Sequence, residues 1–485
     1  MTAFNDLIDG MSAGRDWHLM GNTDEVRALM SRVYDERYHG AAHFKDRYQQ
    51  RVNLQKKEDA ASWAGWINAE NPNSGPYNGT SFVWFPGTNG SVAVLVIGTD
   101  GFGADTHILG RPGHARRLRA LSRLHRGKLW VKPDVLDLGG HVPSSVIQDW
   151  PEIPAAMKAY SHVIYAAVAV CDASSAAVVS DLLDLFFVEH GTPLTGKSKT
   201  NWEQREIAIS GAIFPAVEEA SVLATLRTRR FLILEGPPGT GKTRLAWRLA
   251  EAIGSSRKIQ FHPARTYEDF VVGLFPRPTA DGLAFDVRPG DLLLANAAAE
   301  KQDHVLVIDE INRADLARVL GEALVLFEVG AEPRAITLPH VPKEFPKELQ
   351  LSRHLHVLGT RNTADRSIAR MDLAIRRRFA FIEVWPDLRA VQSEEDPVAI
   401  DLFGQTIHTF AEYADDDVLR LVPGHAYFLD PRPDLDPAGR AGRVAQRLEF
   451  ELVPLLRDYV SERLCGGATE AVAGLADRVE AGLRG

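Results

Sequence analysis

The sequence predicts an α/β domain with a parallel sheet, preceded by an α+β domain and followed by a small helical domain. Short apolar strands with the sequences FLILE, HVLVIDE and HLHVLGT alternate with helical stretches after residue 205. This alternation is typical of a parallel sheet that is covered by helices. From Asp387 onward the apolar spacing is mostly helical. The first 190 residues differ from the rest, because they hold six of the nine tryptophans.

Local patterns divide the chain further. Residues 81–99 contain two β-rich runs around a Pro/Gly/Asn turn, which predicts a hairpin. Residues 160–188 are Ala-rich and apolar and are predicted to be helical. A polar stretch with Gly and Pro follows and predicts a linker. The expected boundaries are 1–190 for the N-terminal α+β domain, 191–205 for the linker, 206–386 for the α/β domain and 387–485 for the helical domain.

The composition excludes several classes of protein. A chain of 485 residues is too long for one ordinary core and suggests two or three domains. It has 45% apolar and 25% charged residues, as globular proteins do. We expect no membrane segment, because no apolar run is long enough to span a bilayer, and no secretory signal. Cys171 and Cys465 form no metal or disulfide pattern, so a reducing cytoplasm is the expected compartment.

The net charge of -9 means that any nucleic-acid contact is local. The stretch RPGHARRLRALSRLHRGKLWVK at 111–132 holds eight Lys or Arg and no acid. Two interpretations stay open. The stretch is either a basic helix that covers an acidic neighbour or a contact surface for DNA.

A phosphate-binding loop follows the strand Phe231–Glu235. The segment 236–243 matches G-x-x-x-x-G-K-[ST] between a strand and a helix. Its residues are Gly236, Pro237, Pro238, Gly239, Thr240, Gly241, Lys242 and Thr243. Glycines let backbone N–H groups converge on phosphate oxygens, and the next helix directs its positive end at them. We expect Lys242 to reach the β- and γ-phosphates and the Thr243 hydroxyl to bind Mg²⁺.

Two acids end the strand that begins at His304. Asp309 is the expected Mg²⁺ ligand, and Glu310 is the expected general base that polarises the attacking water. Adjacent acids at the end of an apolar strand are costly unless a cation or a reactant lies there. The strand Leu355–Thr360 leads to Asn362, which we expect to position the water against the γ-phosphate. An ordinary solvent-facing strand end is the alternative for the acids.

Three successive arginines, Arg376, Arg377 and Arg378, precede an apolar strand. A guanidinium supplied to a neighbouring subunit's phosphate neutralises charge in the transition state and contributes roughly 10³ to 10⁵ in rate. The position favours delivery in trans and therefore a head-to-tail ring. The alternative is that one or two of them, Arg376 above all, only form interface salt bridges.

Several motifs in the same order resemble the McrB family of AAA+ proteins, the NTPase subunits of modification-dependent restriction systems. The resemblance covers about residues 231–459. It rests on FHPARTYEDFVVGLFP at 261–276, VIDEINRADLARVLGEAL at 307–324, RNTADRSIARMDLAIRRRFAFIE at 361–383, VPGHAYFLD at 422–430 and LEFELVPLLRDYV at 448–460. It implies an AAA+ P-loop core with a small helical lid.

The resemblance also implies roles for individual residues. It makes Asn362 the sensor, Asp365 part of the signature loop, and Arg377 and Arg378 the trans arginines. It places His425 where the lid approaches the nucleotide. The family has Met before the NTADRS block where this chain has Arg361, which adds a charge beside the sensor. The P-loop contacts only phosphates, so both ATP and GTP stay open as the nucleotide; McrB itself uses GTP.

The resemblance implies a homo-oligomeric ring, such as a hexamer, that powers or gates an antiviral DNA restriction complex. No nuclease signature is visible in the sequence, so the implied partner is a separate McrC-like nuclease. DNA is expected to bind through the N-terminal domain. Its aromatic residues either offer stacking faces for a flipped base or form ordinary core; they are Trp63, Trp66, Tyr77, Phe82, Trp84 and Phe85. The alternatives are a MoxR-type ATPase that remodels protein partners and a non-catalytic nucleotide switch.

Overall fold

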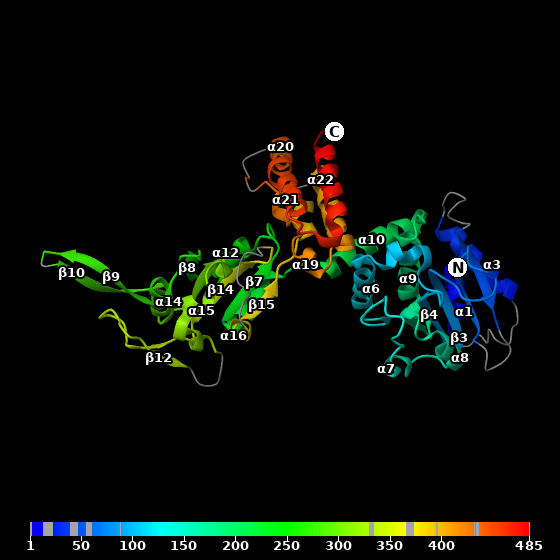
Figure 1. Cartoon of the computed structure of the whole chain (residues 1–485), viewed down its shortest axis with the longest axis horizontal. Helices are drawn as coiled ribbons and strands as arrows, with labels where there is room; N and C mark the ends of the chain where they lie inside the picture. The colour runs from blue at the N-terminus through cyan, green and yellow to red at the C-terminus, as the bar shows by residue number, and fades with distance from the viewer. Residues whose placement is uncertain are drawn as a thin grey trace. The chain divides into compact units, whose positions relative to one another are not determined.

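The computed structural model contains two compact units (Figure 1). One unit comprises Met1–Ile213 with Ala411–Ala414, and the other comprises Phe214–Phe410 with Asp415–Gly485. The structure describes residues 2–12, 23–38, 47–54, 61–87, 89–280, 282–328, 334–364, 373–393, 396–430, 432 and 436–484.

An antiparallel six-stranded sheet forms the centre of the N-terminal unit. Its strands, in spatial order, are β1 (Tyr48–Asn53), β2 (Trp63–Asn68), β3 (Thr80–Gly87), β4 (Gly90–Ile97), β6 (Ile164–Val170) and β5 (Leu129–Val131). β3 and β4 are the hairpin that the turn at residues 86–90 predicted. The expected α+β character of this unit is confirmed. Its helices are α1 (Ala3–Met11), α3 (Thr23–Arg37), α5 (Thr106–Leu109), α6 (Pro112–Leu124), α7 (Ser144–Ile147), α8 (Pro154–Tyr160), α9 (Ala176–Glu189) and α10 (Gly196–Ile213).

The two faces of this sheet carry different cores. On one face, the rings of Trp66 and Phe82 lie 5.7 Å apart, and Trp66 lies 5.7 Å from Phe187 of α9. The opposite face presents the alternate side chains, among them Val83 and Phe85, which pack with residues of the segment that contains α7 and α8. The period of two along the strands therefore separates the two cores.

Two predictions for this unit were wrong in part. Residues 160–188 were expected to be one helix, but the structure has β6 followed by α9 there. A short apolar run such as IYAAVAV fits a buried strand as well as a helix, and the pairing of β6 with both β4 and β5 decides for the strand. The expected linker also differs, because residues from Gly196 onward form α10, which buries Trp202, Ile209 and Ile213.

The second unit is built on a five-stranded sheet in which all neighbouring strands are parallel. The strands, in spatial order, are β15 (Ala380–Glu383), β7 (Phe231–Gly236), β14 (Leu355–Asn362), β11 (His304–Asp309) and β8 (Ser255–Gln260). The three strands predicted from their apolar sequences are therefore present and parallel. This result confirms the α/β core.

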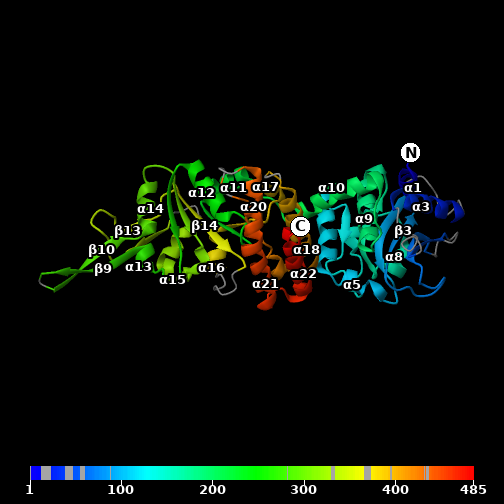
Figure 2. The ribbon, with the colours of Figure 1, turned by 90° about the horizontal axis from the view of Figure 1, so that it is seen from above.

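Helices cover both faces of this sheet (Figure 2). Leu232 and Leu234 of β7 pack with Leu245 and Leu249 of the helix that follows the phosphate loop. Phe231 and Ile233 point to the other face. The helices are α11 (Glu219–Arg229) and α12 (Lys242–Ile253) on the first face, and α13 (Tyr267–Phe270), α14 (Asp291–Ala299) and α15 (Leu316–Leu320) on the second. Burial on both faces explains why these strands are almost continuously apolar.

Smaller elements complete this unit. They are the hairpin of β9 (Val272–Thr279) and β10 (Gly282–Pro289), which projects beyond the sheet in Figures 1 and 2, the pair β12 (Ala335–Thr337) and β13 (Glu348–Gln350), and α16 (Leu373–Arg376).

The segment after residue 387 is helical, as expected. Its helices are α17 (Leu388–Gln392), α18 (Pro397–Tyr413), α19 (Asp416–Leu419), α20 (Pro437–Arg447), α21 (Val453–Ser461) and α22 (Thr469–Arg484). Throughout the described part of the chain, no helix combines the length and the apolar character that crossing a bilayer requires.

Candidate nucleotide site

The candidate site lies at the carboxyl ends of three neighbouring strands. β7 ends at Gly236, β11 ends at Asp309 and β14 ends at Asn362. In open α/β sheets, this edge is where ligands bind. The parallel register brings the ends of these strands together, although about 125 residues of sequence separate the first from the last.

The loop between β7 and α12 has the backbone that phosphate binding requires. Gly239 has a φ of +75°, a left-handed conformation that glycine adopts without strain. Gly241 is the N-cap of α12 and makes no side-chain cap hydrogen bond. The first N–H groups of the helix therefore have no capping side chain, so they are suited to an anion.

Lys242 is buried in this loop without a carboxylate partner among the described residues. Its Nζ donates to the Pro237 carbonyl at 2.6 Å. Burial lowers the pKa of Lys242 to about 8, and the nearby charges of Glu310 and Asp309 oppose that shift only in part. A buried ammonium group without a bonded anion is costly. Triphosphate oxygens would supply the missing negative charge, so the residues present fit a nucleotide.

The predicted metal ligands lie in contact. The Thr243 hydroxyl donates to Asp309 Oδ1 at 2.8 Å. A hydroxyl and a carboxylate are oxygen donors of the kind that Mg²⁺ prefers. The two residues come from α12 and β11, so the fold itself assembles this donor pair. The pair fits Mg²⁺, and the metal would neutralise phosphate charge there.

Thr360 connects the two acids and was not predicted from the sequence. Its hydroxyl donates to Asp309 Oδ1 and accepts a hydrogen bond from the Glu310 N–H at 3.1 Å. Glu310 has a φ of +52°, which is strained for a residue that carries a Cβ. The side chain of Thr360 thereby fixes the backbone at the point where the predicted base leaves the strand. The available signal was a single hydroxyl residue at the end of the apolar strand HLHVLGT.

The predicted sensor, Asn362, lies at the end of β14. Its side-chain oxygen accepts from the Ala364 N–H at 3.1 Å, and its backbone carbonyl accepts from Asn312 Nδ2 at 3.4 Å. The oxygen is thus used locally, and the side-chain NH₂ remains the group suited to donate to a water or a phosphate. Asp365, predicted for the signature loop, lies outside the described residues.

The charge of Arg361, which stands where the McrB family has Met, is neutralised within the sheet. Arg361 Nη1 lies 3.1 Å from Glu235 Oε2, and both side chains are largely buried. The two residues are direct cross-strand neighbours on β14 and β7. The extra charge beside the sensor therefore has a counter-charge on the strand that leads into the phosphate loop.

The helical segment closes over the phosphate loop through the residues around His425. The N–H groups of Gly424 and Ala426 donate to the carbonyls of Pro238 and Gly239 at 2.8 and 2.9 Å. A Cβ on Gly424 would lie 2.1 Å from the Gly239 carbonyl carbon, so only glycine permits this approach. The sequence predicted the proximity of His425 to the nucleotide region but not this backbone pairing.

The His425 ring has a defined orientation. Its Nδ1 accepts from the Asp387 N–H at 3.1 Å. Burial lowers the pKa of His425, and the positive charges of Arg244 and Lys242 add to the shift, against Asp387. The neutral ring then carries its proton on Nε2, which lies 3.4 Å from the position that a Cβ of Gly241 would take. This N–H can donate to an anion in the loop.

The three arginines after α16 differ in their surroundings. Arg378 is largely buried, forms an ion pair with Glu328, and donates to the Ala374 carbonyl at 2.8 Å. Arg376 lies over the ring of Phe381 at 5.1 Å. Arg377 is exposed, and its guanidinium has no polar partner among the described residues. The three side chains are therefore not equivalent: Arg378 is paired, Arg376 lies over a ring, and Arg377 is exposed without a polar partner among the described residues.

The aromatic residues of the N-terminal unit also divide into two groups. Trp66, Phe82 and Trp84 are buried core residues. The others border a cleft of about 980 Å³ on the opposite face of the sheet. Among its lining residues are Trp63, Tyr77, Phe85, Tyr160 and the amide side chains of Gln49, Gln50 and Asn53. The core interpretation is therefore confirmed for Trp66, Phe82 and Trp84, and the stacking interpretation stays a prediction for the residues that line the cleft.

Comparisons with known proteins find relatives of part of this chain. A model of the AAA domain, dynein-related subfamily, matches residues 231–379. The type IV methyl-directed restriction enzyme EcoKMcrB subunit of Escherichia coli (strain K12) is 34% identical over 199 residues, which cover 39% of this chain and 42% of that protein. The type II restriction enzyme BsuMI component YdiS of Bacillus subtilis (strain 168) is 24% identical over 201 residues, covering 33% and 58%. An uncharacterized Escherichia coli (strain K12) protein, YehL, is 27% identical over 201 residues, covering 40% and 51%. The chain thus spans about half the length of the curated relatives it matches.

Proposed function

Because this chain carries the P-loop AAA domain of the McrB-like NTPases, we propose that it hydrolyses a nucleoside triphosphate, ATP or GTP, to drive or gate a DNA restriction complex. The observation that carries the proposal is the convergence of Lys242, Thr243, Asp309 and Glu310 at one sheet edge. In the proposed reaction, Lys242 binds the β- and γ-phosphates, and Thr243 and Asp309 hold Mg²⁺.

Glu310 acts as the general base, and Asn362 donates to the attacking water. Substituting Glu310→Gln removes the base but keeps the size and hydrogen-bonding capacity of the side chain. This variant should bind nucleotide and fail to turn it over. Binding is measured by fluorescence titration and turnover by phosphate release. Normal turnover in the variant would refute the assignment of the base.

We further propose that the active form is a homo-oligomeric ring, a hexamer, in which Arg377 reaches the nucleotide of the neighbouring subunit. The exposure of Arg377, which has no polar partner among the described residues, supports this role. The sequence made Arg378 a candidate for the same role. We infer a structural role for Arg378 instead, which its ion pair with Glu328 supports. Arg377→Ala should bind nucleotide and hydrolyse it poorly.

Mixing two inactive variants tests whether each nucleotide site is shared between neighbouring subunits. Arg377→Ala and Glu310→Gln subunits are each expected to be inactive alone. A mixed ring contains interfaces in which an intact base faces an intact arginine, so activity should partly return. No recovery at any mixing ratio would mean that Arg377 acts within its own subunit.

The DNA role is proposed from the relatives, two of which are named as parts of restriction enzymes. We propose an McrC-like nuclease as a separate partner subunit in a reducing cytoplasm. We also propose that the N-terminal unit contacts DNA, for which the cleft bordered by Trp63 and Tyr77 offers aromatic faces and amide hydrogen-bonding groups. Affinity purification with the products of neighbouring genes should recover a nuclease. Failure to recover one would count against the restriction role.

A further inference from the structure

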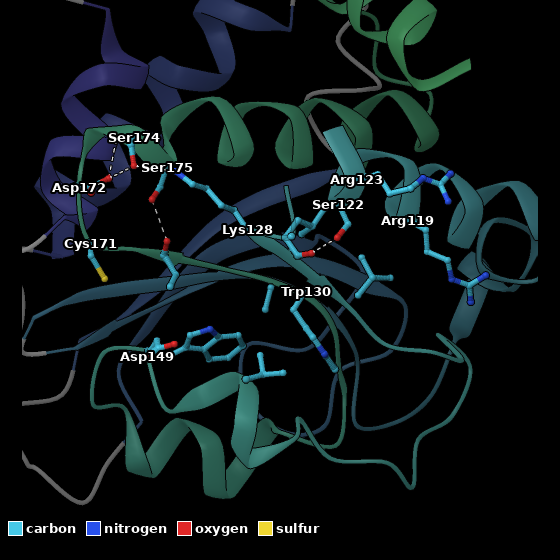
Figure 3. A pocket seen from close by; sticks show the side chains of 17 residues that line it. Arg119, Ser122, Arg123, Lys128, Trp130, Asp149, Cys171, Asp172, Ser174 and Ser175 are labelled. Atoms are coloured by element: carbon cyan, nitrogen blue, oxygen red, sulfur yellow. Dashed lines mark hydrogen bonds between the residues drawn. The ribbon is translucent and has the colours of Figure 1, made fainter. Parts of the chain in front are cut away.

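A second cleft in the N-terminal unit, of about 840 Å³, lies beside the edge strand β5. Figure 3 shows its lining. Arg119 and Arg123 lie at one side, Asp172 and Ser174 lie at the other, and Trp130 lies between them. Several of its lining residues belong to the basic stretch at 111–132, for which the sequence left two interpretations open.

Most cations of that stretch fall into two sets in the structure, and Arg126 and Lys132 belong to neither. Those on the buried side of α6 are paired within the unit. Arg117 lies 3.4 Å from Glu189 and 3.1 Å from Glu206, and His114 Nδ1 lies 2.6 Å from Glu189. For these residues the first interpretation holds, because they cover acidic neighbours.

Arg119, Arg123 and Lys128 form the other set, which we call the cleft cations. Arg119 donates to the Pro133 carbonyl, Arg123 to the Ala212 carbonyl at 2.7 Å, and Lys128 to the Ser174 hydroxyl at 3.2 Å. All three side chains belong to exposed residues, and none lies within 4 Å of a described carboxylate. Neutral groups therefore orient the charges of Arg119 and Arg123, whereas the charge of Lys128 also acts on the Asp172 carboxylate.

Local sequence explains why these cations gather. Arg119 and Arg123 are four residues apart on α6, so they project from the same face of the helix. The chain then turns at Arg126 and Gly127, which have φ values of +54° and +80°. This tight turn brings Lys128 and the following strand β5 back beside the helix. Trp130 of β5 is half-buried and forms an apolar wall next to the cations.

The acids of the cleft are few and partly engaged. The Asp172 carboxylate accepts from the Ser174 N–H at 2.8 Å and from the Ser174 hydroxyl. Asp149 is the other acid in the lining. Both labelled acids lie away from Arg119 and Arg123 in Figure 3. The arginine side of the cleft therefore carries two positive charges away from the acids, whereas Lys128 reaches Ser174 on the other side.

We propose that the cleft cations bind the phosphodiester backbone of DNA, with Trp130 contacting the sugar or base beside the bound phosphates. Arginine suits phosphate because its planar fork donates two parallel hydrogen bonds. An aromatic side chain beside a row of cations is an arrangement that binds nucleic acid without base readout. The inference rests on the proposed DNA role of the N-terminal unit, and it adds a phosphate-binding surface to the cleft bordered by Trp63 and Tyr77.

The test measures the salt dependence of DNA binding by the full chain. Arg119→Gln/Arg123→Gln removes two of the cleft cations. Lys197→Gln/Lys199→Gln is the matched control, because it removes two exposed charges from α10 of the same unit. Thermal unfolding establishes that both variants are folded. Binding is measured by fluorescence anisotropy on two DNA duplexes of unrelated sequence over a range of salt concentrations.

Each phosphate contact contributes roughly 0.9 to the slope of log affinity against log salt. The arginine variant should bind both duplexes more weakly and lose about two from that slope. The lysine variant should match the wild type. If the wild type binds DNA and both variants bind equally well, the cleft assignment is wrong, and an acidic protein becomes the alternative ligand. If the wild type fails to bind DNA even at low salt, the proposed DNA role also fails.

Discussion

Replacing Thr360 with valine tests how the site positions its two acids. Valine keeps the shape of threonine and removes the hydroxyl. The Glu310 N–H then loses its acceptor at 3.1 Å, and Asp309 loses a donor. Thr360 is 2% exposed, so water cannot readily replace these bonds. The strained backbone at Glu310 should then relax and move the base.

The magnitude follows from the bonds lost. A buried donor without a partner costs about 1–3 kcal/mol, and a hydrogen bond to a charged group contributes about 1.5–3 kcal/mol. If the two lost hydrogen bonds together stabilise the transition state by about 1.5–3 kcal/mol, kcat falls roughly 10- to 150-fold without them. KM should change much less, because the phosphate loop and Lys242 are untouched.

The assay is steady-state hydrolysis together with chemical unfolding. Thr360→Ser retains the hydroxyl and should recover most of kcat. Thr406→Val is the matched control, since Thr406 is also fully buried but its hydroxyl donates to the Leu402 carbonyl within α18. A kcat within twofold of the wild type in folded Thr360→Val protein would refute the positioning role.

Three further predictions concern the same domain. Burial lowers the pKa of Lys242 to about 8. Between about pH 8 and 10.5, this group therefore binds more protons in the unfolded chain than in the folded one. Its contribution to the free energy of unfolding rises with pH across that window. Nucleotide phosphates favour the charged form of Lys242, so nucleotide binding near pH 8 should be accompanied by the uptake of roughly half a proton. Calorimetry in buffers of different ionisation enthalpy measures this uptake. No uptake by the wild type, or equal uptake by Lys242→Met, would contradict the prediction. Arg378→Ala should lower the free energy of unfolding by about 1–2 kcal/mol, because it removes the largely buried Arg378 from its ion pair with Glu328, which keeps Arg334 as a second partner at 2.7 Å. A stability equal to that of the wild type would refute the structural role. Arg377→Ala should leave the unfolding free energy within about 0.5 kcal/mol of the wild type and lower only the rate, so a large loss of stability would show that Arg377 is also structural.

The sequence predicted the nucleotide domain well, because its motifs join local pattern to chemistry. A phosphate loop must follow a strand and precede a helix, so the sequence motif alone predicted that Lys242 lies at the start of the helix after β7. The same holds for Asp309 at the end of an apolar strand. Parallel pairing then brings Thr243 and Asp309 together without further information.

The remaining features depend on pairings between distant parts of the chain. Residues 164–170 form a strand only because β4 and β5 flank them. The role of Thr360 depends on the register between β14 and β11, which no local pattern specifies. The distinction between Arg377 and Arg378 depends on Glu328, which lies about 50 residues earlier in the chain. Periodicity cannot reveal which of several adjacent cations finds a partner.

The most direct test of the central claim is steady-state hydrolysis of GTP and ATP, with and without DNA, using Lys242→Ala as the blank. We predict turnover of at least one nucleotide by the wild type, stimulation by DNA, and none in Lys242→Ala. Preference for GTP would strengthen the link to McrB and its nuclease partner, whereas preference for ATP would keep the NTPase and weaken that link. Turnover that DNA never changes would contradict the restriction role and favour a remodeller of protein partners. Equal turnover in wild type and Lys242→Ala would contradict the nucleotide site itself.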